Sequence, residues 1–388
     1  MTETKLEAML SLPTEFKIRE VSSLTSLRTQ SVEAPPLGPL ADFSGTFKGN
    51  GFNTIFRPQN PATPTNLPTP NPTSDNILEL NLTRETLSFS KSLGAVPNRG
   101  SAQGDITLNG VPYLQTINDV TVPSQPTGIH FEPGLWLSVP ATTEPAEGIT
   151  FVRMASIPHG TTIVAQGTSS TINGKPVIPP VDITPFTTGN PGNKFAFPSQ
   201  TATNQNTPRI PQDLTSFLAA GTITQAMLTD PNVLLRNHIA TQNITSTTAI
   251  SISTNPAAPL FGGGTDNIAF LLGDANTPPA KPNAQTLLMT ATFWIETVEH
   301  VITVPPFKLG HRPLEIHAET GEAGQPAPKF LVSPPIDILA PRQITVTATQ
   351  IQYSQVVFLN FNGLTWPHVS VATLVPSEAI PIPPSAWT

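Results

Sequence analysis

Short stretches of alternating apolar and polar residues run through the first half of the chain, separated by Pro, Gly, Asn and Asp. An alternation of period two is the pattern of a strand with one buried face, and regular turn residues between strands favour antiparallel pairing. The sequence therefore predicts antiparallel strands that form a barrel or a sandwich. The strands predicted in this half are 43–52, 77–82, 86–89, 106–108, 128–131, 135–139, 149–157 and 162–168.

The same pattern returns towards the C-terminus. In the last predicted strand, His368, Ser370, Ala372 and Leu374 share one face, and the residues between them share the other. Strands on both sides of the chain's middle favour one mainly β domain, an antiparallel barrel, over two separate domains. The strands predicted in this part are 247–253, 286–304, 344–353, 356–361 and 368–375.

Between these two parts the pattern becomes helical. A short helix that begins at Pro211 is predicted to end at Gly221, because glycine is the usual helix stop. Asp230 and Pro231 supply an N-cap and a first-turn proline for a second helix. We interpret residues 211–242 as a small helical insertion on the β scaffold.

Proline-rich segments indicate how the chain is organised. Residues 1–39 are predicted to be an N-terminal arm that ends in a Pro-rich boundary. Residues 40–388 are predicted to be a single elaborated barrel domain. Residues 58–74 and 186–210 are rich in Pro, Asn, Gly and Thr and are predicted to be long loops.

Composition narrows the classes of function. The chain has 388 residues, no Cys, 45 Pro and a net charge of −7. Its 19 basic residues are spread thinly, so we expect no nucleic-acid partner. No apolar run approaches the ~18 residues of a membrane span, and the first residues do not resemble a signal peptide. The absence of Cys excludes disulfides and thiolate ligands, and we expect a cytoplasmic protein.

Candidate chemistry rests on histidines, because the sequence contains no P-loop, dinucleotide fingerprint, nucleophile elbow or HExxH motif. His130 and Glu132 are two residues apart in a predicted strand and point to the same side. Such a pair can ligate a metal, or the carboxylate can orient the imidazole. Alternatively it is a plain hydrogen bond beside a Glu-Pro-Gly turn. His159 lies in a predicted turn and is a further candidate, or an ordinary turn residue.

His368 follows Trp366 and Pro367 and begins the last apolar strand. An imidazole that points inward beside an aromatic residue can be the axial ligand of haem iron, with the opposite face open to small gases. A single histidine on an apolar strand can equally be a core residue whose hydrogen bonds are satisfied.

Several segments, in the same order, resemble the nitrobindin family, the ferric-haem-binding β-barrels related to fatty-acid-binding proteins. One departure is Phe47, where the family's opening motif has Trp, and the long loops have no counterpart in that family. The segments that carry the resemblance are Gly45-Thr-Phe-Lys-Gly-Asn-Gly51, His130-Phe-Glu-Pro-Gly134, Pro158-His-Gly160 with Val164-Ala-Gln-Gly167, Gln350-Ile-Gln-Tyr-Ser354 and His368-Val-Ser-Val-Ala-Thr-Leu374.

The resemblance implies a calycin-type barrel that binds haem b in an apolar pocket. His368 takes the position of the proximal iron ligand, and Trp366 would pack against the porphyrin. The implied chemistry is nitric oxide binding, isomerisation of peroxynitrite or a peroxidase-like reaction. We predict His130 and His159 as the catalytic candidates of this pocket.

Three alternatives stay open from the sequence. The barrel could carry a fatty acid or another apolar small molecule without haem, with residues 211–242 as the lid of the pocket. It could be a cupin-type metal enzyme with His130, Glu132 and His159 as ligands. It could also be a structural β-protein without a ligand, and a homo-oligomer is open in every case.

Overall fold

The computed structural model describes residues 33–69, 74–257, 262–273, 283–319, 324 and 326–387. Residues Ala34–Thr388 form one compact unit. Most of the predicted N-terminal arm, residues 1–32, lies outside the described residues.

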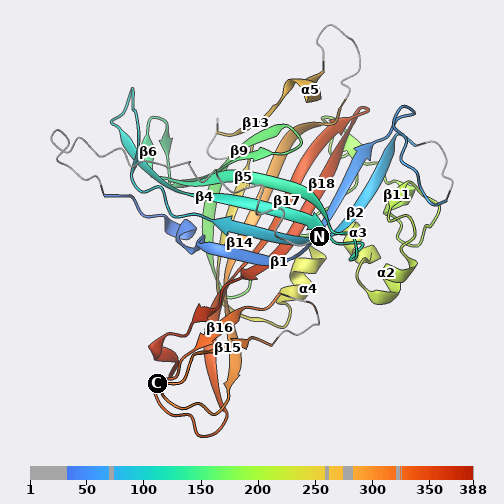
Figure 1. Cartoon of the computed structure of the whole chain (residues 1–388). Coiled ribbons are helices and arrows are strands. Elements are labelled where there is room, and N and C mark those ends of the chain that lie inside the picture. The colour runs from blue at the N-terminus through green and yellow to red at the C-terminus, as the bar shows by residue number, and fades with distance from the viewer. Residues whose placement is uncertain are drawn as a thin grey trace, which may run out of the picture. The chain divides into compact units, whose positions relative to one another are not determined.

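Ten antiparallel strands close into a barrel, so the predicted mainly β barrel is confirmed (Figure 1). Pairing of β1 with both β2 and β18, and of β2 with β4, closes the ring. The barrel strands are β1 (Gly45–Pro58), β2 (Asn76–Phe89), β4 (Ile106–Asp119), β5 (Thr127–Val139), β8 (Thr150–Ile157), β9 (Thr161–Asn173), β12 (Asn243–Ser253), β14 (Gln285–Val304), β17 (Arg342–Phe361) and β18 (Leu364–Pro376).

Shorter elements decorate the barrel. The additional strands are β3 (Val96–Asn98), β6 (Thr142–Thr143), β7 (Ala146–Glu147), β10 (Phe186–Thr187), β11 (Arg209–Ile210), β13 (Gly264–Asn267), β15 (Leu314–His317), β16 (Lys329–Val332) and β19 (Ile380–Pro381). The helices are η1 (Gly38–Asp42), η2 (Pro198–Gln200), α2 (Thr215–Ala220), α3 (Gln225–Thr229), α4 (Val233–Ile239), α5 (Ala269–Leu272) and η3 (Pro384–Trp387).

Several barrel strands are longer than the sequence predicts. β2, β5 and β17 each join two predicted strands, and β4 continues to Asp119 instead of ending near residue 108. The predicted breaks fall at polar residues such as Glu85 and Gln355, which are buried inside the barrel. The expected Glu-Pro-Gly turn is also wrong, because β5 runs straight through Gly134. A side chain there would collide with the ring of Tyr113.

One end of the barrel is filled by apolar side chains, and we call it the closed end. The segment that contains η1 enters this end and buries Leu40 and Phe43. The Phe43 ring stacks on Phe89 at 4.6 Å between centroids and meets the edge of Trp136 at 5.4 Å. The interior of the closed end is therefore an ordinary packed core.

The helical insertion packs against the outside of the barrel. Buried apolar residues of α3 and α4, such as Met227 and Leu235, lie in one cluster with Phe52, Val369 and Val371 of β1 and β18. The predicted insertion is therefore helical, but its predicted role as a lid over the barrel mouth is wrong. Its apolar residues are used to cover the outer face of the sheet.

Arg209 holds the loop before this insertion together. Its guanidinium is fully buried and donates to six backbone carbonyl groups within 3.3 Å. The acceptors lie in Ser199, Thr201, Ala202, Asn204, Pro211 and Gln212. This one side chain satisfies carbonyl groups that loop backbone would otherwise leave buried without a donor.

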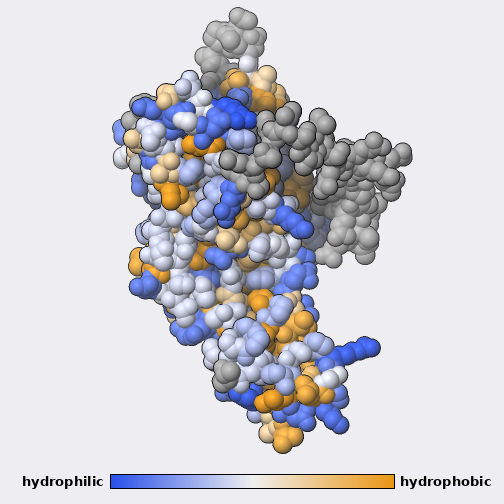
Figure 2. Space-filling view, turned by 90° about the vertical axis from the view of Figure 1, so that its left-hand side faces the viewer, coloured by the Kyte–Doolittle hydropathy of each residue, from blue (hydrophilic) through white to orange (hydrophobic). Residues whose placement is uncertain are grey.

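A third apolar cluster lies beyond the barrel. β14 and β17 are 20 residues long, and their far ends pair through Val304 and Arg342. The sheet β15–β16–β19 and η3 pack around these ends, with Phe330 and Trp387 buried. In Figure 2, the face turned to the viewer is mostly hydrophilic, with hydrophobic side chains in scattered groups. No helix in the described part of the chain is long and apolar enough to span a membrane.

Candidate functional site

The end of the barrel opposite η1 contains a cavity of about 860 Å³, within the usual range of small-molecule sites. We call it the upper cavity. Its walls come mainly from β1, β2, β4, β5, β17 and β18, and its mouth is lined by residues of α5 and of the loop after β1. These mouth residues include Asn60, Thr63, Phe270 and Leu271. This segment around α5, instead of residues 211–242, lies at the mouth.

Three histidines that the sequence singles out line this one cavity: His130, His159 and His368. They come from β5, from the turn between β8 and β9, and from β18. In the closed sheet, four strand pairings separate β18 from β5 in one direction and six in the other direction. His130 and His368 therefore lie on roughly opposite walls.

His130 and Glu132 point to the same side of β5, as predicted. The His130 Nε2 atom is 3.0 Å from Glu132 Oε2, so the carboxylate orients the imidazole. The Glu132 side chain is fully buried, while 14% of the His130 side chain is exposed. His130 thus stands between the cavity and a buried charge.

The charge on Glu132 is balanced by Arg153 of β8, which the sequence analysis did not single out. Arg153 Nη2 lies 2.5 Å from Glu132 Oε1, and Tyr113 donates its hydroxyl to the same oxygen. The other Arg153 nitrogens donate to Tyr113 at 2.8 Å and to Gln355 at 2.6 Å. The guanidinium is also stacked over aromatic rings, 5.2 Å from the Phe293 centroid.

This pairing keeps both groups ionised. Burial by itself would raise the pKa of Glu132, but the charge of Arg153 and hydrogen bonds from His130 and Tyr113 lower it to about 2. Burial would likewise lower the pKa of Arg153, and Glu132 and Tyr113 raise it instead. A permanent ion pair therefore lies directly behind His130.

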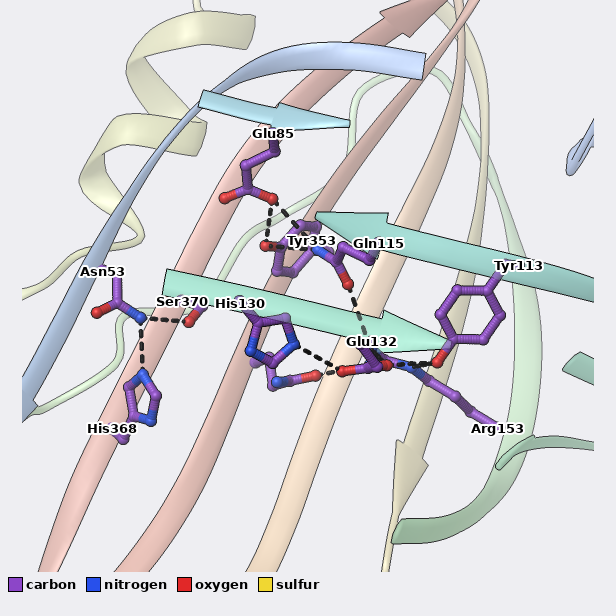
Figure 3. A network of polar contacts seen from close by, with 11 residues as sticks. Asn53, Glu85, Tyr113, Gln115, His130, Glu132, Arg153, Tyr353, His368 and Ser370 are labelled. Atoms are coloured by element: carbon purple, nitrogen blue, oxygen red, sulfur yellow. Dashed lines mark hydrogen bonds and ion pairs between the residues drawn. The ribbon is translucent and has the colours of Figure 1, made fainter. Parts of the chain in front are cut away.

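The polar network continues across the barrel through amide and phenol groups (Figure 3). Gln115 accepts from Arg153 at 3.4 Å and donates to Glu85 at 3.2 Å and to Tyr353 at 3.1 Å. Tyr353 in turn donates to Glu85 at 2.6 Å. Because this carboxyl is buried, its pKa is raised, despite the hydrogen bonds from Tyr353, Thr83 and Gln115.

His368 lies in a second polar cluster on the cavity wall. Asn81, Asn53 and Ser370 occupy directly opposed positions on β2, β1 and β18. Asn53 donates its amide nitrogen to His368 Nε2 at 2.7 Å and to Ser370 at 2.8 Å, and its oxygen accepts from Asn81 at 3.2 Å. Burial, then the charges of His130 and His159, lowers the pKa of His368 to about 3, so this imidazole is neutral.

His159 and Trp366 differ in how they relate to the cavity. His159 lies at the rim, in the predicted turn, and its residue is exposed. Partial desolvation of its ring, then the charge of His130, lowers its pKa. Trp366 is not among the cavity-lining residues. Its ring stacks on Phe361 at 4.4 Å, and its indole nitrogen donates to the Phe361 carbonyl. Trp366 packs behind Phe56, so its position does not favour a direct porphyrin contact.

The proposed cupin-type metal site gains no support from the geometry. His130 and Glu132 meet, and His159 lines the same cavity. Yet no group of three His, Asp or Glu side chains in the described part of the chain is arranged to hold a metal ion. Glu132 is already bound to Arg153, which competes with any cation for the same oxygens.

Sequence reasoning missed the partners that make this site. Arg153 sits between apolar neighbours in a predicted strand, Phe151-Val-Arg-Met-Ala155. A charged residue in such a strand indicates a buried ion pair, because a buried charge requires a partner of opposite charge. Asn53, Gln115 and Gln355 carry no comparable signal, because amides are common in this chain.

Comparison with protein-family models, with curated proteins and with solved structures finds no match for this chain. The closed ten-strand barrel is consistent with a calycin-like fold, and no family match supports nitrobindin in particular.

Proposed function

We propose that the chain is a small-molecule-binding β-barrel whose ligand occupies the upper cavity between β5 and β18. The observation that carries this proposal is the placement of three histidines from distant parts of the sequence on the walls of one cavity of about 860 Å³. Apolar residues such as Ile117, Val357 and Leu359 share these walls with the polar groups. A mixed lining of this kind is typical of ligand pockets.

Haem b, with His368 as the iron ligand, is the specific occupant that the sequence resemblance suggests. His368 fits this role because it is neutral and lines the cavity, and a neutral imidazole has one nitrogen lone pair for iron. Asn53 donates to Nε2, however, so binding through that nitrogen requires this contact to break. When bound, haem would supply the redox and gas-binding chemistry, while the chain would supply the axial imidazole and a partly apolar cavity.

A haemin titration tests this occupant. The unaltered protein is expected to give a shifted Soret band that saturates at one haem per chain, and His368→Ala is expected to abolish the shift. His317→Ala is a matched control, because His317 is exposed on β15, outside the lining of the upper cavity. A spectrum of His368→Ala identical to that of the unaltered protein would remove His368 as the ligand.

A colourless organic molecule is the second candidate occupant. It is favoured by the contact between Asn53 and His368 and by the amide and hydroxyl groups of Gln115, Gln355 and Ser370 in the lining. These groups suit a ligand with polar atoms better than the hydrocarbon chain of a fatty acid. Native mass spectrometry of the purified protein distinguishes this case by an added mass without a chromophore.

A further inference from the structure

His130 and His368, which line the upper cavity, have fixed hydrogen-bonding roles. Glu132 is ionised, and a carboxylate only accepts hydrogen bonds. His130 Nε2, at 3.0 Å from Glu132 Oε2, therefore carries the hydrogen. The lone pair of a neutral His130 ring is then on Nδ1.

His368 has the opposite arrangement. The orientation of the Asn53 amide is set by two further contacts, since its oxygen accepts from Asn81 and its nitrogen donates to Ser370. The amide nitrogen therefore also faces His368 Nε2, which must accept. In the neutral ring the hydrogen is then on Nδ1.

Both Nδ1 atoms are available to a ligand. Neither atom has a hydrogen-bond partner among the residues that the structure describes, and both rings line the upper cavity. Figure 3 shows the second nitrogen of His130 on the side of its ring away from Glu132. The cavity thus presents a hydrogen-bond acceptor on one wall and a donor on the opposite wall.

We propose that the upper cavity catalyses proton transfer in an enolisable carbonyl compound, with His130 as the base and His368 as the hydrogen-bond donor to the carbonyl oxygen. This inference rests on the proposed small-molecule site. It requires no metal, cofactor or oxidant, and it assigns a function to the ion pair behind His130.

Proton abstraction by His130 turns the carbonyl compound into an enolate. The C–H bond next to the carbonyl breaks, and its proton moves to His130 Nδ1. The bonding pair forms the new C=C bond, and the carbonyl π pair moves to oxygen, where the Nδ1–H group of His368 donates a hydrogen bond. Returning the proton to the oxygen gives the enol, and returning it to carbon gives back the ketone.

Glu132 and Arg153 act on this step through His130. The fixed carboxylate holds Nε2–H and stabilises the imidazolium that forms when Nδ1 takes the proton. Glu132 is therefore a positioning residue. The ¹⁵N spectrum of the unaltered protein tests both ring assignments, since His130 is expected as the Nε2–H tautomer and His368 as the Nδ1–H tautomer.

The experiment uses phenylpyruvate in deuterated buffer, with loss of the C3 proton signal followed by NMR. The unaltered protein is expected to accelerate exchange over buffer, and His130→Ala to lower the rate at least about 100-fold, with partial recovery on addition of imidazole. His317→Ala is the matched control, because His317 also pairs with a carboxylate two residues away, Glu315, outside the upper cavity.

Two results would overturn the inference. One is exchange that is equally fast with His130→Ala and with the unaltered protein. The other is no acceleration by the unaltered protein. In either case, saturable binding of a small molecule in the upper cavity would leave the proposed binding function standing, whereas loss of that binding would remove both.

Discussion

Replacing Arg153 with Met is expected to lower the free energy of unfolding by about 3–5 kcal/mol. The substitution keeps most of the side-chain volume but leaves the fully buried Glu132 carboxylate without its charged partner. Tyr113 and Gln355 also each lose a hydrogen-bond partner. Urea denaturation at pH 7, followed by tryptophan fluorescence, measures the loss.

A surface ion pair and a double variant serve as controls. Arg99→Met breaks the exposed pair with Asp105 and is expected to change the stability far less, because water screens this pair. In Arg153→Met with Glu132→Gln, both charges are absent, so a substantial part of the lost stability should return. An Arg153→Met variant as stable as Arg99→Met would contradict a buried ion pair at this position.

The second large effect concerns Glu296, which is buried on the outer face of β14 beneath the helical insertion. Its Oε2 accepts from Gln350 at 2.6 Å, and its Oε1 has no hydrogen-bond partner in the described part of the chain. Burial raises the pKa of Glu296 to about 8. The folded state therefore holds a proton that the unfolded chain releases near its ordinary value of 4.5.

The sign of the pH dependence follows from this difference. The contribution of Glu296 to stability is fully present below about pH 4.5 and is lost as the pH rises to about 8, by about 1.4 kcal/mol per pH unit at most. The free energy of unfolding of Glu296→Gln, relative to that of the unaltered protein, should therefore rise by a few kcal/mol between pH 5 and pH 9. Urea denaturation across this range measures the difference, and parallel pH profiles for the two proteins would contradict it.

The sequence could predict features that depend only on the residue pattern within one strand or helix. Alternation placed His368 and Ser370 on one face of β18 and Val369 and Val371 on the other, and the structure has Ala372 and Leu374 inside with the two valines outside. The same rule placed His130 and Glu132 on one side of β5. Gly221 ends α2, as predicted, and the structure shows it in the left-handed conformation.

Features that depend on partners distant in the sequence could not be predicted. Glu85 falls between two predicted strands, 77–82 and 86–89, yet it is buried in a continuous strand. Tyr353, 268 residues away, donates a hydrogen bond to it. Such contacts allow β2 and β17 to continue through polar residues that point into the barrel. A buried polar side chain is tolerated there only when it forms hydrogen bonds with other buried polar groups. Residues 211–242 likewise pack on the outside of the barrel because the outer face of β1 and β18 is apolar, and a single strand does not show which other segment covers it.

The most direct test of the account is whether small molecules enter the upper cavity. Titration with 1-anilinonaphthalene-8-sulfonate, a fluorescent apolar anion, is expected to saturate at one site per chain. Val357→Trp fills the cavity from β17, whereas Leu339→Trp adds the same ring at a position that is 89% exposed. We expect Val357→Trp to lose this binding and Leu339→Trp to retain it, and equal binding by both variants would contradict a ligand in the upper cavity.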